Sequence, residues 1–453
     1  MEVHSQEQVI PQPALSLKGR WLFRLILLLV AALALWSAAK VVQFNPTDYV
    51  AWQNDWKVVS QCVDAGVSPC PRISKFPPAY LLNAGLAGSA LASDRALLTA
   101  VNVLALMLPV LACLWLRGTR RAVTSLYPYL LALALSPLPL FYVLSGALEL
   151  QSAVFSGLYL GAFVLVLEDP RLSGGKAPVV LMVLSGLVFP LYKDTIAAMV
   201  CLACVVLLWL HRRQLRLWMR EADGRRMLLR AALLAAVPVA LSVAMSLFYN
   251  TFRYDTPMPL GYVEEARQTL PSLGRSAEFL AGSLFSPNGG AVIFWAFPMA
   301  VAAVAWWLEG WVPRRAALVG GLTLLLLSAV AFARWWAPFG WDSWGDRLLI
   351  PPALALMVAA LVSLRPRQAP GRGCPVMALL LLPVVLCSAL YAAAPHFSPA
   401  GQAMPDSLWP GPACARMQQA IPEQALAEGM AFWKGQIYYD CARERMLHIP
   451  APR

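Results

Sequence analysis

A succession of apolar runs, each close to the length that crosses a lipid bilayer, is the strongest constraint on how this chain folds. A transmembrane helix needs about 20 predominantly apolar residues. Hydrophobic residues make up 59% of the 453 residues and charged residues only 13%, about half the charged share of a soluble protein. The runs that we identify as about eleven candidate spans are 21–43, 95–116, 123–144, 151–167, 177–192, 195–210, 231–249, 292–309, 316–333, 350–364 and 376–394.

The runs predict an all-α, polytopic membrane protein with about eleven transmembrane helices. Some runs are short for a full span, notably the two that flank Lys193, and tilting or partial insertion would accommodate them. We also expect re-entrant or amphipathic helices at the outer face. The predicted parts are a cytoplasmic tail at 1–20, a transmembrane domain at 21–394 with outer loops at 44–94, 250–291 and 334–349, and a small outer appendage at 395–453.

The net charge of +12 is explained by membrane topology. With the amino terminus inside, 20 of the 36 basic residues but only 7 of the 24 acidic residues fall in inner segments. The other 16 basic and 17 acidic residues nearly balance, so the excess positive charge lies on one side, as the positive-inside rule requires. We therefore expect no nucleic-acid partner. The inner loops also lack the glycine-rich patterns that hold nucleotide phosphates, so an ATP-driven transporter is disfavoured.

Four of the nine cysteines, Cys62, Cys70, Cys414 and Cys441, fall on the predicted outer face. An even number in an oxidising compartment is typical of disulfides, most simply 62–70 and 414–441. Four free thiols are the alternative, and no histidine accompanies them at zinc-ligand spacing. A 414–441 disulfide would stabilise the appendage, which is too small for a large core. The appendage either covers the active face, contacts the acceptor or is a passive tail.

Acidic residues follow the first apolar run directly. Asp48 and Asp55 stand seven residues apart with Trp52 between them, so a helix here would place both carboxylates on one face. A Pro-Pro pair at 77–78 then turns the chain back toward the bilayer. Glu149 lies in the short second outer loop. Acidic residues held beside aromatics at a membrane surface suit chemistry on a substrate that is partly lipid.

Three segments on the predicted outer face resemble one enzyme superfamily. They are SKFPPAYLL in the first loop, FRYDTPMPLGY with GSLFSPNGGAV in the fourth, and WDSWGDRLLIP in the fifth. In this order, over about 21–365, they are similar to the GT-C superfamily of integral-membrane glycosyltransferases. Two departures stand out: Gly345-Asp346 replaces the usual Gly-Pro, and a doubled acidic pair in loop one is absent.

The resemblance implies transfer of a sugar from a polyprenyl-phosphate donor to an acceptor hydroxyl. The acceptor would be a lipid-linked glycan, a glycolipid or a protein. The reaction would take place at the outer face of the bacterial inner membrane, with the amino terminus cytoplasmic and the carboxyl terminus periplasmic. The sugar and the subfamily are not assigned by the motifs.

Sugar transfer needs a base for the acceptor hydroxyl and cations for the departing phosphate. Asp48 is our first candidate for the base and Asp55 the second. Glu149 would orient the acceptor or help to hold a divalent metal such as Mg²⁺ or Mn²⁺. The alternative for Asp48 is a structural helix cap. No metal site is assigned, because no histidine triad can be drawn.

Lys193, Arg347 and Arg253 are the candidate phosphate ligands. Lys193 stands between two apolar runs, where an ionisable group is costly unless it is used or paired. Its alternatives are an ion pair with Asp194 or snorkelling to the interface. Arg347 precedes the helix that enters the membrane at LLIPP, and its guanidinium suits bidentate phosphate capture. We expect Lys193 and Arg347 to converge on one anionic group, the phosphate of the donor lipid.

Four aromatic residues are candidates for stacking on the sugar or the prenyl chain. They are Trp52, Tyr262, Trp341 and Trp344. Tryptophan and tyrosine also gather at membrane interfaces without any catalytic role, and that interpretation stays open for each of them.

Two other classes of function remain as alternatives. A transporter or flippase of lipid-linked sugars would carry its charges at the bilayer midplane in interrupted helices. In this chain the charges gather in outer loops. An O-antigen polymerase or ligase is also polytopic, but it does not need acidic residues directly after the first helix.

The predicted topology can be checked with reporter fusions. We expect a fusion at Arg225 to report the cytoplasm and a fusion at Arg453 to report the outer side, because this arrangement segregates the arginines. Cytoplasmic signals from both positions would show that the predicted number of spans is wrong by at least one.

Overall fold

The computed structural model describes the central part of the chain. The side chains of 46–55 and of a few further positions are outside this description. The described residues are 46–67, 78–80, 83, 85, 94–143, 148–169, 171–172, 176–257, 270–286, 289–335, 338–339, 346–367, 412 and 436–447.

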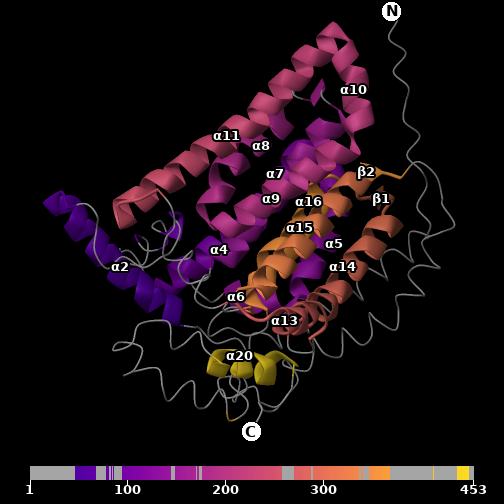
Figure 1. Ribbon diagram of the computed structural model, residues 1–453. Helices are drawn as coiled ribbons and strands as arrows, with labels where there is room; N and C mark the ends of the chain where they lie inside the picture. The colour runs from indigo at the N-terminus through magenta and orange to yellow at the C-terminus, as the bar shows by residue number, and fades with distance from the viewer. Residues whose placement is uncertain are drawn as a thin grey trace, which may run out of the picture.

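Nine of the predicted apolar runs fall on helices of a single bundle (Figure 1). The runs 21–43 and 376–394 lie outside the described residues. The bundle helices are α4 (Asp94–Arg117), α5 (Thr119–Ala134) with α6 (Pro137–Val143), α7 (Glu149–Glu168), α8 (Lys176–Val188) with η2 (Phe189–Leu191), α9 (Asp194–Leu210), α11 (Ala222–Tyr254), α14 (Ala291–Leu308), α15 (Arg315–Ala333) and α16 (Ile350–Val362).

The described residues do not show eleven full spans. Four helices are long and apolar enough to cross a membrane, and a fifth is counted if α9 and the helix after it form one bent span. Three further apolar helices are shorter than a span. Two runs are interrupted near a proline: α5 ends before Pro137, and α8 gives way to a 3₁₀ turn that contains Pro190. Proline lacks the N–H that an α-helix needs, so these runs contain broken helices.

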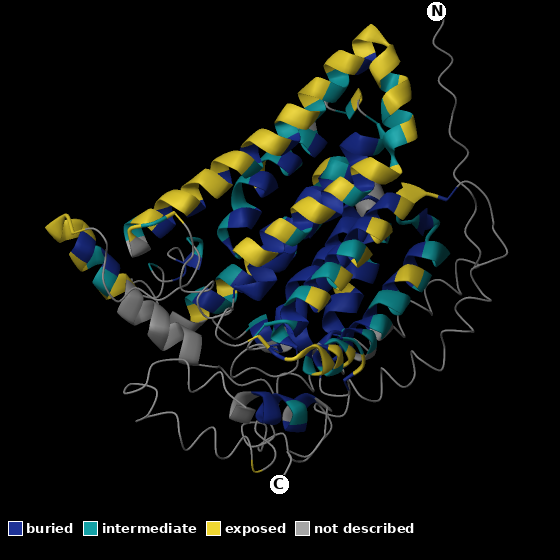
Figure 2. Ribbon diagram, in the orientation of Figure 1, coloured by how far each residue is buried: buried dark blue, intermediate teal, exposed yellow. Residues whose placement is uncertain are grey.

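Helix α7 is the centre of the bundle. Nearly all of its residues are buried, whereas α11 exposes much of its length (Figure 2). Two glycines let α16 approach closely: a Cβ added at Gly157 would lie 2.6 Å from the Cβ of Val358, and one at Gly161 would lie 2.7 Å from the Cβ of Val362. Small residues at such contacts are typical of helix packing in membranes.

The remaining elements gather at the two ends of the bundle. Figure 1 shows α10 and the β1–β2 pair at one end, and α6, α13 and α20 toward the other. The segments predicted to be inner thus lie at one end and those predicted to be outer at the other, and the topology itself stays a prediction. The bounds are α2 (Pro46–Ala65), α10 (Arg212–Arg220), α13 (Leu273–Phe285), β1 (Trp311–Val312), η3 (Arg347–Leu349), β2 (Arg365–Pro366), α20 (Gln436–Ala442) and the π-helical turn η6 (Arg443–Leu447).

Arginines at the β1–β2 end satisfy helix carbonyls and a carboxylate. Arg117 donates from Nη2 to the carbonyls of Leu361 and Val362, at 2.8 Å each, where α16 ends. The last carbonyls of a helix have no partner within the helix, so this cation is well placed there. Arg314 forms an ion pair with Glu168 at the end of α7.

The described part of the carboxyl-terminal appendage packs on α13. Asp440 accepts a hydrogen bond from Arg275 at 3.2 Å, and Arg443 lies 3.0 Å from Glu278. Tyr439 contacts the ring of Phe279, with the centroids 5.7 Å apart. These contacts join the segment to α13, and its role stays a prediction.

The cysteines of the bundle, Cys113, Cys201 and Cys204, are free. Cys62 on α2 and Cys441 on α20 are buried. Their expected partners, Cys70 and Cys414, lie outside the described residues. The pairing therefore stays a prediction.

The close contact of α7 with α16 predicts that Gly157→Ala lowers stability. The new methyl group would clash with Val358 and with the carbonyl oxygen of Ala355, 2.7 Å away. Overpacking of this kind costs about 1–3 kcal/mol, which thermal unfolding in detergent would measure. Gly274→Ala is the control, because nothing lies within 4 Å of a Cβ at that position. Equal effects at both glycines would contradict the close-packing argument.

Candidate functional site

The site is organised around Glu149, the first residue of α7. Its side chain is only 7% exposed, so the carboxylate is nearly removed from water. An acidic residue in the first turn of a helix interacts favourably with the positive end of the helix dipole. A buried carboxylate still needs a direct counterion, because its desolvation is costly.

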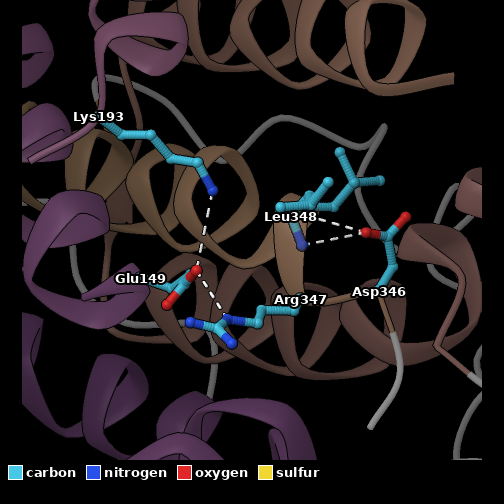
Figure 3. A network of polar contacts seen from close by, with 6 residues as sticks. Glu149, Lys193, Asp346, Arg347 and Leu348 are labelled. Atoms are coloured by element: carbon cyan, nitrogen blue, oxygen red, sulfur yellow. Dashed lines mark hydrogen bonds and ion pairs between the residues drawn. The ribbon is translucent and has the colours of Figure 1, made fainter. Parts of the chain in front are cut away.

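Two cations provide that counterion through one oxygen atom (Figure 3). Arg347 donates a hydrogen bond from Nε to Oε1 of Glu149 at 2.8 Å. The Nζ atom of Lys193 lies 3.8 Å from the same oxygen. The two nitrogens are therefore close neighbours, although the residues come from distant parts of the chain. The structure thus brings Lys193 and Arg347 together on the carboxylate of Glu149, and their predicted convergence on a donor phosphate stays a prediction.

Arg347 is positioned by its own short helix. The side chain of Asp346 accepts hydrogen bonds from the backbone N–H groups of Leu348 and Leu349, at 3.1 and 3.2 Å, and so caps η3. The backbone N–H of Arg347 donates to the carbonyl of Phe339 at 3.1 Å. Asp346 replaces the proline of the GT-C pattern, and capping is the structural role of its buried carboxylate here.

Lys193 is held between η2 and α9 in an extended conformation, as the residue that precedes α9. Its Nζ atom lies 5.5 Å from the centre of the Phe332 ring, in cation–π geometry. The preceding residue, Tyr192, is buried and stacks on Phe155 of α7, with the ring centroids 5.7 Å apart. These contacts direct the ammonium group toward Glu149.

The three charged groups differ in exposure, and this decides what the site can bind. The side chain of Lys193 is 28% exposed and that of Arg347 is 15% exposed, against 7% for Glu149. Two partly exposed cations thus contact one buried carboxylate. Such an arrangement suits an anion that approaches from the exposed side.

Three helices begin at this cluster. Helix α7 starts at Glu149, α9 starts beside Lys193, and α16 follows the η3 turn that carries Arg347. The positive ends of three helix dipoles therefore meet where the cations meet. Helix amino termini favour anions by the same electrostatics, so the backbone adds to the charge of the side chains.

The observed contact of Glu149 differs from its expected role in acceptor orientation or metal binding. Its Oε1 atom is occupied by the two cations, and its Oε2 atom is buried without a hydrogen-bond partner in the described part of the chain. Glu149 thus neutralises and positions Lys193 and Arg347. No group of three or more His, Cys, Asp or Glu residues suited to a metal occurs within the described residues.

The first outer loop packs beside the same cluster. Val59 and Cys62 of α2 share a buried apolar group with Leu148 and Tyr192, the neighbours of Glu149 and Lys193. In the return segment, the N–H of Ala79 donates to the carbonyl of Leu191 at 3.0 Å. The loop that carries Asp48 and Asp55 is thereby tied to the ends of α7 and α8.

The predicted acidic residues lie on α2, which confirms that this segment is helical. Asp48 falls in the first turn of the helix and Asp55 two turns later. Their side chains, and that of Trp52, are outside the described residues, as is the side chain of Arg253 at the end of α11. Tyr262, Trp341 and Trp344 also lie outside them.

A buried polar link beside the site was missed by the sequence analysis. Gln151 on α7 donates to the side-chain oxygen of Asn102 on α4 at 3.1 Å. Asn102 in turn donates to the carbonyl of Val143, at the end of α6, at 3.2 Å. Each of these two apolar runs contains one of the amide residues Asn102 and Gln151. Because a buried amide requires hydrogen-bond partners, this pattern could have predicted the link.

Comparisons with protein-family models, with curated proteins and with solved structures give no match to this chain. The function is therefore argued from the site itself.

Removal of the shared counterion is predicted to destabilise the fold. Glu149→Gln leaves two neighbouring cations without a carboxylate, and we expect a loss of about 1–3 kcal/mol in the free energy of unfolding. Denaturation in detergent micelles would measure it. A double-mutant cycle with Arg347→Met would separate the pairwise interaction from other effects.

Glu168→Gln is the matched control at the opposite end of α7. It breaks the ion pair with Arg314, in which both side chains are more than 20% exposed, so solvent should limit its cost to about 1 kcal/mol or less. Losses of the same size at both positions would argue against a special role for Glu149.

Proposed function

We propose that the protein is a membrane glycosyltransferase that moves a sugar from a polyprenyl-phosphate donor to an acceptor hydroxyl. The reaction would take place at the outer face of the bacterial inner membrane. The observation that carries this proposal is the convergence of Lys193 and Arg347 on buried Glu149. It is supported by the resemblance of the outer loops to GT-C enzymes.

The cations suit the phosphate of such a donor. When the bond from the sugar to the phosphate breaks, the phosphate gains negative charge, so fixed positive charges stabilise the transition state more than the ground state. Glu149 holds Lys193 and Arg347 together in the free enzyme, where their mutual repulsion would otherwise separate them. The ends of α7, α9 and α16 contribute in the same direction.

Asp48 is the proposed base, with Asp55 as the second candidate. The apolar group shared by α2, Leu148 and Tyr192 holds their helix at the end of the bundle where the cations lie. A carboxylate there would take the proton of the acceptor hydroxyl as the anomeric carbon becomes cationic. Arg253 and the aromatic residues Trp52, Tyr262, Trp341 and Trp344 are proposed to contact the donor.

A donor panel tests the proposal directly. Purified protein is incubated with defined polyprenyl-phosphate sugars, with and without Mg²⁺ or Mn²⁺, and consumption of each sugar lipid is followed by mass spectrometry. We expect one donor to yield free polyprenyl phosphate as its sugar passes to an acceptor hydroxyl or, where no acceptor is supplied, to water. Movement of an intact sugar lipid across proteoliposomes would instead indicate a flippase. Consumption of polyprenyl-diphosphate glycans alone would indicate a polymerase or ligase.

Asp48→Asn is predicted to lower the rate of sugar transfer by a factor on the order of 10²–10⁴, because the amide keeps the size but loses the basicity. Thermal unfolding should change little. Asp55→Asn should reduce the rate less if that residue only positions the substrate. Near-normal turnover by the Asp48 variant would transfer the role of base to Asp55.

Arg347→Lys is predicted to reduce transfer markedly, on the order of tenfold or more, although the charge is kept. A lysine cannot reproduce the planar fork of the guanidinium, and it would change the contact with Glu149. The measurement is kcat and KM for the donor together with thermal unfolding. A variant that is folded, stable and fully active would show that Arg347 contributes only its charge.

A further inference from the structure

Helix α10 lies at the inner end of the bundle between two apolar helices (Figure 1). It is bent by 66° from α9 and leads directly into α11. None of its residues is buried, and Figure 2 shows a largely exposed ribbon around this corner. The apolar helix α9 ends at this corner and the apolar helix α11 begins there. If α9 and α11 enter a bilayer, α10 must therefore lie at the depth of the lipid head groups.

The arginines of α10 occupy one side of the helix. At about 100° per residue, Arg212, Arg213, Arg216 and Arg220 fall within a sector of about 100°. The half-buried residues Leu215 and Trp218 lie on the opposite side, and Leu215 packs against the bundle core. Arg213, Arg216 and Arg220 are exposed and face away from the bundle, whereas Arg212 is half-buried.

The first turns of α11 extend this positive surface. Arg225, Arg226 and Arg230 are exposed, and the only acidic residues between Arg212 and Arg230 are Glu221 and Asp223. Arg212 donates to the carbonyl of Trp209 at 2.8 Å. The structure gives the side chains of the other six arginines no hydrogen bond or ion pair with any described residue. They are Arg213, Arg216, Arg220, Arg225, Arg226 and Arg230.

This surface differs from the other arginines at the same end of the bundle. Arg117 donates hydrogen bonds to helix carbonyls, and Arg314 forms an ion pair with Glu168, as described above. The corner that presents the α10 row is also tightly built: a Cβ at Gly224 would lie 2.2 Å from the carbonyl oxygen of Trp218. The geometry of the row is thus fixed by the fold.

We infer that α10 and the first turns of α11 form a docking surface for the phosphate groups of anionic phospholipids in the inner leaflet. Guanidinium groups bind phosphate oxygens well, and basic residues next to a membrane are attracted to anionic lipids. Leu217 and Met219, 60% and 51% exposed, border the arginine row. Exposed apolar side chains beside the cations suit the boundary between head groups and acyl chains better than a nucleic acid.

The test uses the full chain in a zwitterionic detergent. Phosphatidylglycerol or phosphatidylcholine is titrated in, and bound lipid is counted by native mass spectrometry while thermal unfolding is followed. We expect the protein to prefer phosphatidylglycerol. The triple variant Arg213→Gln, Arg216→Gln and Arg220→Gln should bind that lipid about tenfold more weakly or worse, since each arginine near the surface contributes substantially.

The matched control removes the same charge from the same end of the protein. Arg171, Arg315 and Arg365 are also exposed but are scattered, so their replacement by glutamine should leave phosphatidylglycerol binding nearly unchanged. An equal loss in both triple variants would reduce the effect to net charge and overturn the inference. It would also be overturned by equal binding of the two lipids, or by soluble tripolyphosphate stabilising the protein as well as the lipid does. Circular dichroism would verify that both variants are folded.

Discussion

The carboxylate of Glu149 is the interaction on which the described end of the bundle depends. A buried negative charge is tolerated only when cations and hydrogen bonds replace the water it has lost. Here a single oxygen is shared by Arg347 and Lys193, which come from the starts of two other helices. The ion cluster thereby fixes the ends of α7, α9 and α16 relative to one another. The side chains of Lys193 and Arg347 stay partly open to solvent, which suits an anionic ligand.

The two ends of the bundle use arginine in opposite ways. At the β1–β2 end, Arg117 binds carbonyls where α16 ends, and the cation compensates the negative end of a helix dipole. At the other end, Arg347 lies where α16 begins and pairs with a carboxylate instead. Here the cations and the positive helix ends add rather than cancel. The partial exposure of both cations beside these helix ends supports the proposed donor phosphate.

Two segments that are distant in sequence contact the loops that bear Lys193 and Arg347. The return segment of the first outer loop bonds to Leu191, two residues before Lys193. In the carboxyl-terminal segment, Tyr439 packs on Phe279, Phe279 contacts Phe339 edge-on at 5.6 Å, and the carbonyl of Phe339 holds the backbone of Arg347. Displacement of either segment would therefore disturb the position of a cation in the proposed site.

The sequence by itself determined the helical membrane class, nine helix positions and the candidates Lys193, Arg347 and Glu149, because apolar length and isolated charges are local signals. Only the tertiary structure revealed that Glu149 is the counterion of both cations and that Gln151 donates a hydrogen bond to Asn102. It also showed fewer than eleven spans among the described residues. Hydropathy measures the apolar content of a window. It contains no information about which residues meet in space, whether 49 positions apart, as Asn102 and Gln151 are, or 198 apart, as Glu149 and Arg347 are. Nor does it show where a proline-bearing run breaks into two shorter helices.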